Sequence, residues 1–320
     1  MTSTTTLTTT ACEVAVIGAG YTAREHIRAL RDLSGVHVAA IHSRTRSRAE
    51  ALAAEFGIEA VCDSVPELYE RSRAALVFVT VPELALNAVA KASFGFPWTV
   101  VMEKPPGYNL ADALDIQRAA EDRQCHVLAA LNRRFLAATL RAQAELAETS
   151  APRFIKVQDQ QSQSAARAGG QPVEVVRNFM YANSIHTIDY LRIFGRGKIT
   201  SVEPILRWDA EHPGAVVCRI GYSSGDVGLY EGIWHGPGPW AVTVTVPGKR
   251  WEMRPLERLT SQELGHPPEC ADPSLWDTNF KPGFRLQAEA AVASACGRPS
   301  PSVSLADAVE TMRLIARIFT

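Results

Sequence analysis

The stretch EVAVIGAGYTA, Glu13–Ala23, decides the fold of the first part of this chain. Its apolar run ends at Ile17 and is typical of a strand buried on both faces. Gly18 permits a tight turn, Gly20 lets backbone approach a diphosphate, and the small Ala23 permits close packing of a helix on the strand. The helix N-terminus adds free N–H groups and a favourable dipole. We therefore predict a dinucleotide site, rather than a plain tight turn, with contacts from Gly18, Gly20, Tyr21 and Thr22.

Apolar runs alternate with amphipathic stretches between residues 13 and 131. The predicted strands are Glu13–Ile17, Val36–His42, Ala75–Thr80, Thr99–Met102 and His126–Leu131. The predicted helices are Ala23–Leu33, Arg46–Phe56, Leu84–Ala92 and Ala111–Arg123. Such alternation is typical of βαβ units and of a parallel sheet covered on both faces. We predict an α/β fold in which residues 12–131 form a doubly wound, Rossmann-type dinucleotide-binding domain.

The pattern changes after residue 131. Helices are predicted at Asn132–Glu148, Val175–Phe194, Phe284–Ala295 and Leu305–Phe319, the last with Ser304 as N-cap. Strands are predicted at Arg153–Gln160, Ile199–Arg207, Ala215–Tyr222, Val227–Trp234, Trp240–Val246 and Arg250–Arg254. Turn residues separate these strands, which is typical of an antiparallel sheet. We predict a second, α+β domain over residues 132–320, with an open and mainly antiparallel sheet.

The composition limits the class of protein. The 320 residues are 46% apolar and 21% charged, with a net charge of −1. This balance argues against binding to nucleic acid or an anionic membrane, and no apolar run approaches the ~20 residues that span a bilayer. The six cysteines are scattered, so we expect free thiols in a reducing cytoplasm and no metal site. Residues 1–11, MTSTTTLTTTA, are predicted to form a disordered tail.

The end of the second predicted strand bears on the choice of cofactor. NAD sites usually place Asp or Glu there to bind the ribose 2′-hydroxyl, whereas Arg accommodates a 2′-phosphate. This chain has no acid there, and reads His42-Ser43-Arg44. Ser43 and Arg44 can bind and neutralise a phosphate. We predict a preference for NADP(H) over NAD(H), the alternative being a solvated basic helix start.

Two further motifs carry ionisable groups suited to chemistry. Glu103-Lys104-Pro105 follows an apolar run, so Lys104 is predicted at the carboxyl end of a strand, where open parallel sheets bind ligands. His186 and Asp189 are three residues apart on a predicted helix and share a face. Imidazole titrates near neutral pH and suits proton exchange. The alternatives are a surface lysine and a hydrogen-bonded interdomain histidine.

With these motifs, the chain resembles the glucose–fructose oxidoreductase / inositol dehydrogenase (Gfo/Idh/MocA) family from residue 12 to residue 320. The resemblance includes Asn132-Arg133-Arg134-Phe135 and the segment that begins at Ser304. It implies a Rossmann domain, a second domain whose sheet often mediates oligomerisation, and hydride transfer on sugar-like substrates.

The resemblance also implies roles for particular residues. Lys104 would lie near the nicotinamide and bind the reacting oxygen, where an ammonium stabilises negative charge or passes a proton. His186 would exchange the proton, with Asp189 orienting its ring or binding a substrate hydroxyl. Glu103 would pair with Lys104 or hold the backbone near the cofactor. From the residues alone, Asn183 is a candidate for substrate binding, and Arg133 and Arg134 are weaker candidates for a phosphate on the substrate, the alternative for both arginines being solvated helix or loop positions.

Two departures from the family pattern bear on the substrate. Many relatives carry Asp four residues before the histidine, where this chain has Ala182. The fourth turn often reads Thr-Pro-Asn with a later His, whereas this chain has Thr80-Val81-Pro82-Glu83 followed by Leu86. Thr80 and Pro82 are still expected to form a turn that contacts the cofactor. Both departures suggest a substrate unlike simple inositol or glucose.

The sequence thus predicts an NADP(H)-dependent oxidoreductase acting on a small-molecule substrate. Its leading reaction is reduction of a keto group on a sugar or sugar-nucleotide, and its first alternative is imine (C=N) reduction. A non-catalytic NADP-sensing regulator is the alternative from another class, and a redox-neutral lyase or glycosidase is a third. A homodimer or homotetramer through the second sheet is expected, because an open sheet needs a cover.

Overall fold

The structure, a computed structural model, describes residues 12–320, and the tail predicted for residues 1–11 lies outside the described residues. Its first sheet is entirely parallel, and strand order reverses between β1 and β4. Crevices at such reversals, beyond the strand carboxyl ends, bind nucleotides. In spatial order the strands are β3 (Ala60–Cys62), β2 (Val36–His42), β1 (Cys12–Ile17), β4 (Leu76–Val79), β5 (Thr99–Glu103) and β6 (Val127–Ala130).

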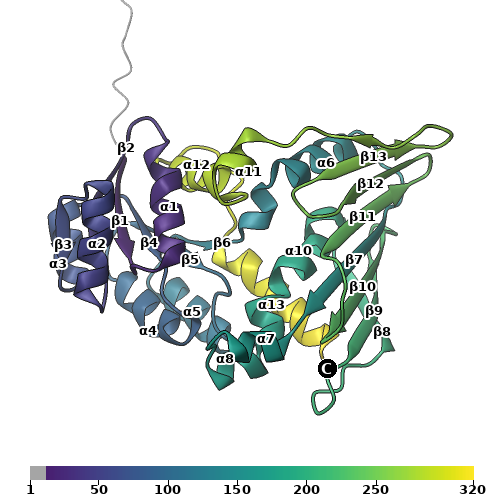
Figure 1. The fold of residues 1–320 in the computed structure, drawn as a ribbon, viewed down its shortest axis with the longest axis horizontal. Helices are drawn as coiled ribbons and strands as arrows, with labels where there is room; N and C mark the ends of the chain where they lie inside the picture. The colour runs from purple at the N-terminus through teal and green to yellow at the C-terminus, as the bar shows by residue number, and fades with distance from the viewer. Residues whose placement is uncertain (1–11) are drawn as a thin grey trace, which may run out of the picture.

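Helices cover both faces of this sheet (Figure 1). On one face lie α1 (Tyr21–Arg31) and α2 (Arg46–Phe56), and on the other α3 (Val65–Ser72), α4 (Glu83–Ser93) and α5 (Leu110–Asp122). Sequence analysis missed β3 and α3. The overlooked signal is a reciprocal cap: Ser64 Oγ accepts from the Glu67 N–H at 3.2 Å, and Glu67 Oε2 accepts from the Asp63 N–H at 2.7 Å.

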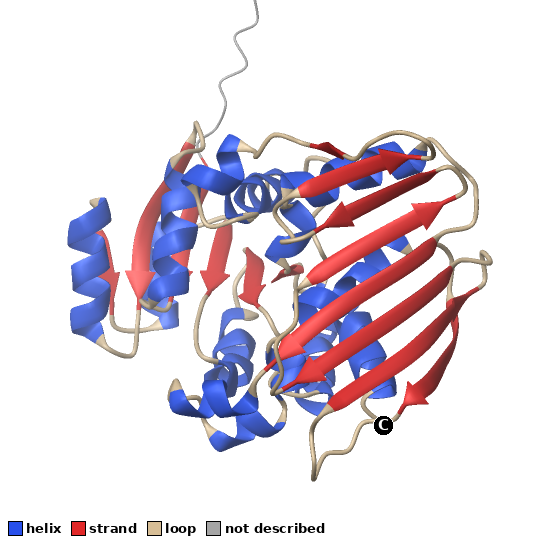
Figure 2. Cartoon of the chain, turned by 45° about the vertical axis from the view of Figure 1, so that its right-hand side comes forward, coloured by secondary structure: helices blue, strands red, loops and turns tan. Residues whose placement is uncertain are grey.

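The second sheet has eight strands, of which only β7 and β10 pair in parallel. Along β7 the side chains of Ile155 and Val157 are buried, and Lys156 between them is half-buried. Figure 2 shows the sheet with helices gathered behind one face, so the other face is free of helices among residues 12–320. In order the strands are β14 (Glu269–Cys270), β13 (Leu259–Glu263), β12 (Lys249–Met253), β11 (Ala241–Val246), β7 (Phe154–Gln161), β10 (Val227–Trp234), β9 (Ala215–Tyr222) and β8 (Ile199–Leu206).

Two of the helices predicted in the second half are broken into shorter pieces, and two short helices were not predicted. The predicted helix Val175–Phe194 is three pieces: α8 (Val173–Arg177), α9 (Phe179–Ala182) and α10 (Ile185–Phe194). The breaks fall at Asn178 and Asn183. The Asn178 side-chain amide donates to the Glu174 carbonyl of α8 and so competes with the backbone ladder, and the Asn183 side-chain amide donates to Gln161 on β7. The predicted helix Asn132–Glu148 is a 3-10 turn, η1 (Asn132–Phe135), followed by α6 (Ala137–Ala147). The other helices are α7 (Gln163–Ala168), α11 (Leu275–Asn279), α12 (Phe284–Ala295) and α13 (Leu305–Ile318).

Helix α12 completes the covering of the first sheet, although it comes from the end of the chain. Residues 12–131 place no helix of their own over β4 and β5 on the α1 face. Phe284 and Ala288 of α12 fill that place and share a core with Val14, Phe78 and Ile27. Figure 1 shows α12 beside α1. The second half of the chain is therefore packed directly against the helix that follows the glycine-rich turn.

Other features of residues 12–320 concern thiols, metals and membranes. All six cysteines are free. Within these residues, no three or more His, Cys, Asp or Glu side chains come together in a way that could hold a metal ion. None of the helices they form combines the length and apolar character that a membrane crossing requires. Ser304 caps α13 as predicted, its Oγ accepting from the Asp307 N–H at 3.1 Å.

Candidate functional site

The glycine-rich turn joins β1 to α1 and leaves the start of α1 open. Gly18 has φ of +111°, and a Cβ there would lie 2.5 Å from the Thr80 carbonyl oxygen, so the turn requires glycine. A Cβ on Gly20 would meet no atom within 4 Å, so the space beside this residue is open. No side chain caps α1, and its first turn carries no acid. The N–H groups of this helix start are therefore free for an anion, which fits the diphosphate of a dinucleotide.

Thr80 supports this turn instead of facing a ligand. Its hydroxyl donates to the Ile17 carbonyl at 3.0 Å, and its side chain is buried against Gly18. The hydroxyl is therefore used to hold the end of β4 beside β1, and the cofactor contact expected from this turn stays a prediction. Pro82 is exposed at the start of α4, which begins at Glu83.

The two residues predicted to select the cofactor lie at the end of β2. Arg44 is exposed and makes no hydrogen bond or ion pair with any of residues 12–320. The nearby Arg46 is bound to Glu50 and Asp63. Ser43 Oγ accepts from the Thr45 N–H at 3.3 Å, and it keeps its own proton free to donate. Of the two arginines, only Arg44 has a guanidinium available to a phosphate.

The structure brings Lys104 and His186 together across the two halves of the chain. Lys104 follows β5, and its Nζ donates to the Ala182 carbonyl at 3.0 Å, just before the helix that carries His186. Burial lowers the pKa of Lys104, an effect that Glu103 and Glu83 oppose and Arg133 reinforces. The Lys104 ammonium is therefore a stronger acid than an ordinary lysine.

His186 has only 8% of its surface exposed, and neither ring nitrogen bonds to any of residues 12–320. Its ring centroid lies 6.0 Å from that of Trp240. Burial, followed by the positive charges of Lys104, Arg133 and Lys281, lowers its pKa well below 6.5. The imidazole is therefore neutral at physiological pH, with its nitrogens available to a ligand.

Glu103 pairs with a residue that sequence analysis missed. Its Oε1 lies 2.6 Å from His26 Nε2, on α1. The His26 ring is fully buried between two phenylalanine rings. Its centroid lies 4.7 Å from that of Phe78 and 4.5 Å from that of Phe284. Glu103 is thereby fixed between α1, α12 and the end of β5, and it orients the backbone that carries Lys104.

Asp189 does not orient His186, contrary to the sequence prediction. Its carboxylate accepts from Arg134 Nε at 2.6 Å and Nη2 at 2.7 Å, and from Thr311 Oγ1 at 2.7 Å. Arg134 also binds Asp307, and Asp307 binds Arg192 at 2.7 Å. The expected phosphate contact of Arg134 is likewise wrong, because two carboxylates already occupy its guanidinium. These residues form a structural network that joins η1, α10 and α13.

Arg133 and Asn183 stay near Lys104 and His186. Arg133 pairs with Glu257, lies 6.0 Å from the Trp240 ring, and has a buried Nε with no partner. Asn183 Nδ2 donates to Gln161 Oε1 at 2.7 Å, which leaves the Asn183 oxygen free of any bond to residues 12–320. Both side chains therefore keep a polar atom that residues 12–320 leave without a partner.

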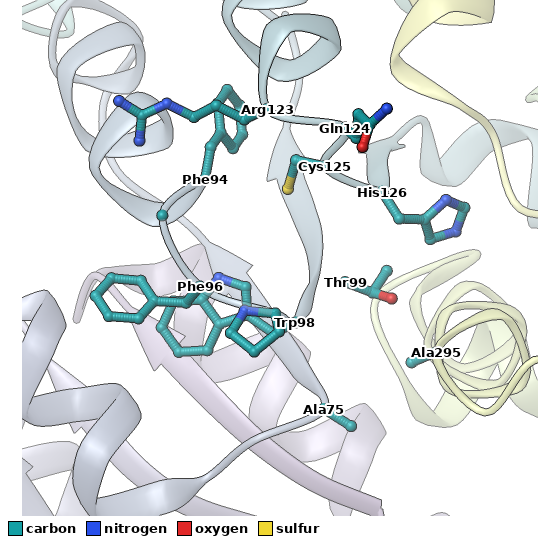
Figure 3. A pocket seen from close by; sticks show the side chains of 12 residues that line it. Ala75, Phe94, Phe96, Trp98, Thr99, Arg123, Gln124, Cys125, His126 and Ala295 are labelled. Carbon is teal, nitrogen blue, oxygen red and sulfur yellow. The ribbon is translucent and has the colours of Figure 1, made fainter.

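A pocket of about 580 Å³ lies at the opposite edge of the first sheet (Figure 3). Ala75, Thr99 and His126, which line it, stand at the amino ends of β4, β5 and β6. Parallel sheets bind nucleotides beyond their carboxyl ends, so this pocket is on the wrong side for the chemistry of Lys104 and His186.

The fold and turn define an NAD(P)-binding protein with a Rossmann domain joined to a second α+β sheet. Residues 12–131 match the model of the Gfo/Idh/MocA family, described as an oxidoreductase family with an NAD-binding Rossmann fold. The match covers the part of the chain that forms the first sheet and its helices. No curated protein sequence is significantly similar to the chain.

Several solved structures share the whole fold at low identity. An aldose-aldose oxidoreductase from Caulobacter crescentus, complexed with glycerol, has a TM-score of 0.80 at 17% identity, covering 96% of both chains. A UDP-N-acetylglucosamine 3-dehydrogenase from Acidithiobacillus ferrooxidans has a TM-score of 0.76 at 16% identity, again covering 96% of both. An oxidoreductase from Agrobacterium radiobacter, in complex with NAD+, L-tartaric acid and magnesium, has a TM-score of 0.73 at 17%, covering 96% of this chain and 95% of that one.

Proposed function

We propose that this protein is an NADP(H)-dependent oxidoreductase that transfers a hydride between nicotinamide and a carbonyl or hydroxyl carbon of a sugar-like or sugar-nucleotide substrate. The observation that carries the proposal is the meeting of Lys104 and His186 beside an uncapped dinucleotide turn. The bound cofactor supplies or accepts the hydride. The side chains of the protein position the substrate, stabilise charge and move a proton.

Lys104 and His186 have different electrostatic roles in this proposal. The Lys104 ammonium binds the reacting oxygen and stabilises the negative charge that develops on it. His186, held neutral, accepts the hydroxyl proton when the substrate is oxidised and must return it when the substrate is reduced.

Oxidation should therefore keep its rate as the pH falls to well below 6.5, whereas reduction should speed up on acidification, because it requires protonated His186.

The substrate class rests on the similar proteins and on the polar groups near Lys104. The names of those proteins refer to aldoses, UDP-N-acetylglucosamine and tartaric acid, all polyhydroxylated compounds. Asn183 and Arg133 offer an amide oxygen and a guanidinium to such a molecule. Imine reduction is the second candidate, because Ala182 places only a backbone carbonyl beside Lys104, where many relatives carry a carboxylate.

Replacement of His186 tests its proposed role. We expect His186→Asn to lower kcat/KM by about 100-fold, the usual effect of losing a positioned acid–base group. The affinity for NADPH, measured by fluorescence titration, should stay unchanged. His126→Asn is the matched control, because His126 lies at the opposite edge of the first sheet. Full activity in His186→Asn, with normal cofactor binding, would favour the NADP-sensing alternative.

Replacement of Arg44 tests the preference for NADP(H). Loss of a charge-assisted contact to the 2′-phosphate should weaken NADPH binding by about ten-fold in Arg44→Ala and leave NADH binding unchanged. Arg46→Ala is the control, because Glu50 and Asp63 already bind Arg46. Tighter binding of NADH than of NADPH by the parent protein would contradict the preference.

The uncovered face of the second sheet supports the proposal of a homodimer or homotetramer. Leu229 and Ile233 of β10 are half-buried on that face, beside Val217 of β9. A second copy of the sheet would bury these apolar side chains. Light scattering that gives a monomer at micromolar concentration would contradict this assembly.

A further inference from the structure

Lys281 is a half-buried lysine that the proposed function does not use. Its Nζ lies 4.5 Å from the centroid of the Phe284 ring and 5.0 Å from that of Tyr21, the first residue of α1. It makes no hydrogen bond or ion pair with any of residues 12–320. Burial lowers its pKa, with Glu103 opposing this effect and Lys104 adding to it. A partly desolvated ammonium beside two aromatic rings is suited to an anionic ligand.

The backbone that carries Lys281 is held rigidly. Asp277 accepts from the N–H groups of Ala137 and Gly283, each at 2.8 Å, and Asn132 Nδ2 donates to the Pro282 carbonyl at 2.9 Å. Gly283 has φ of +80°, and a Cβ there would lie 2.1 Å from the backbone carbonyl oxygen of Asn132. The segment just before α12 is therefore fixed against η1, and it delivers Lys281 from the second half of the chain to the glycine-rich turn.

Several positive charges gather around this position. Lys104, Arg133 and Lys281 all act on His186. Of the carboxylates near them, Glu103 binds His26, Glu257 binds Arg133 and Glu25 binds Arg28, while Glu83 acts on Lys104. None of these four carboxylates forms an ion pair with Lys281 among residues 12–320. The uncapped start of α1 adds its dipole at Tyr21. An anion at this place would meet free donors and compensate charges that now repel one another.

We propose that Lys281 binds a phosphate or carboxylate group between Tyr21 and His186. The proposal rests on the proposed function only in taking the α1 turn as a dinucleotide site. Two sources can supply the anion: the diphosphate of the cofactor, or an acidic group on the substrate. In either case the second half of the chain takes a direct part in ligand binding through Lys281, beyond its contribution of His186.

Binding measurements on Lys281→Met and Lys281→Arg test this inference without any assay of turnover. Methionine keeps the aliphatic contact with Tyr21 and Phe284 but removes the charge. If the anion is the diphosphate, NADPH affinity should fall by about ten-fold in Lys281→Met and largely recover in Lys281→Arg. Adenosine 2′-monophosphate, which carries neither phosphate of the diphosphate, should then bind both variants as it binds the parent protein.

If the anion belongs to the substrate, NADPH affinity should stay unchanged. Inorganic phosphate should then bind the NADPH-saturated parent protein, by calorimetry, and fail to bind NADPH-saturated Lys281→Met. The control for NADPH affinity is Lys198→Met, because Lys198 is exposed between α10 and β8 in the second half of the chain. The inference is overturned if Lys281→Met matches the parent in both measurements, or if Lys198→Met weakens NADPH binding equally. Failure of the parent protein to bind NADPH would instead contradict the proposed function.

Discussion

Lys104→Met should lower kcat/KM by about 1,000-fold, because it removes the cation that stabilises negative charge on the reacting oxygen. The loss should be in kcat more than in KM, since this interaction strengthens as the charge develops. Steady-state kinetics with NADPH and a panel of ketoses and sugar-nucleotides would measure it. Methionine preserves the length of the side chain, so the Lys104 site should keep its packing.

The pH dependence separates this role from a structural one. Burial lowers the pKa of Lys104, so the protonated form is lost as the pH rises through a value below 10.5. Activity of the parent protein should fall over that range. Lys104→Arg should lose this alkaline fall, because a guanidinium stays protonated throughout. Lys91→Met is the matched control, since Lys91 on α4 binds Asp115 on α5. Equal activity in Lys104→Met and the parent would remove Lys104 from the chemistry.

The sequence was sufficient to predict the first sheet because its strands are local and strongly apolar. Val14–Ile17 and Leu76–Val79 are buried on both faces, and each pattern is readable without knowledge of its neighbours. The strand order and the second, mainly antiparallel sheet follow the expected fold class. Strand β3 was missed because three residues carry too little periodicity to be recognised.

Contacts between segments that are distant in the chain could not be predicted from the sequence. Asp189 shares a helix with His186, so spacing alone placed the two together. The structure shows that Arg134 and Thr311, far away in the sequence, bind this carboxylate instead. Lys281 was missed for a similar reason, since residues 255–283 have no clear periodicity and Asp277 and Asn132 position the lysine through tertiary hydrogen bonds.

The placement of α12 explains why the site spans the two halves of the chain. A helix from the C-terminal part fills the face of the first sheet over β4 and β5, and Phe284 at its start stacks on His26. The same packing sets the segment before α12 against the glycine-rich turn. The residues proposed to bind cofactor and substrate are thus held by one shared core, so relative movement of the two halves would disturb Glu103 and the backbone of Lys104 together.

Asp189→Ala should destabilise the fold by about 3 kcal/mol or more, because it leaves a buried guanidinium with one of its carboxylate partners missing. Arg134 has 20% of its side chain exposed and Asp189 has 3%, so solvent replaces little of the lost interaction. Despite its burial, Asp307 has a lowered pKa, because Arg134 and Arg192 lie beside it. In Asp189→Ala, Asp307 would be the single carboxylate left to balance both arginines. Urea denaturation followed by far-UV circular dichroism would measure the loss.

The double variant Arg134→Met with Asp189→Leu separates pairing from packing. Replacement of both charges by apolar side chains of similar volume removes the unpaired guanidinium, so stability should recover above that of Asp189→Ala. His186 keeps its place on α10 in this variant, and kcat/KM at a temperature where the protein is folded should stay within about three-fold of the parent, given that Asp189 does not contact the imidazole. A loss of activity comparable to that of His186→Asn, in a variant of restored stability, would return Asp189 to the catalytic machinery.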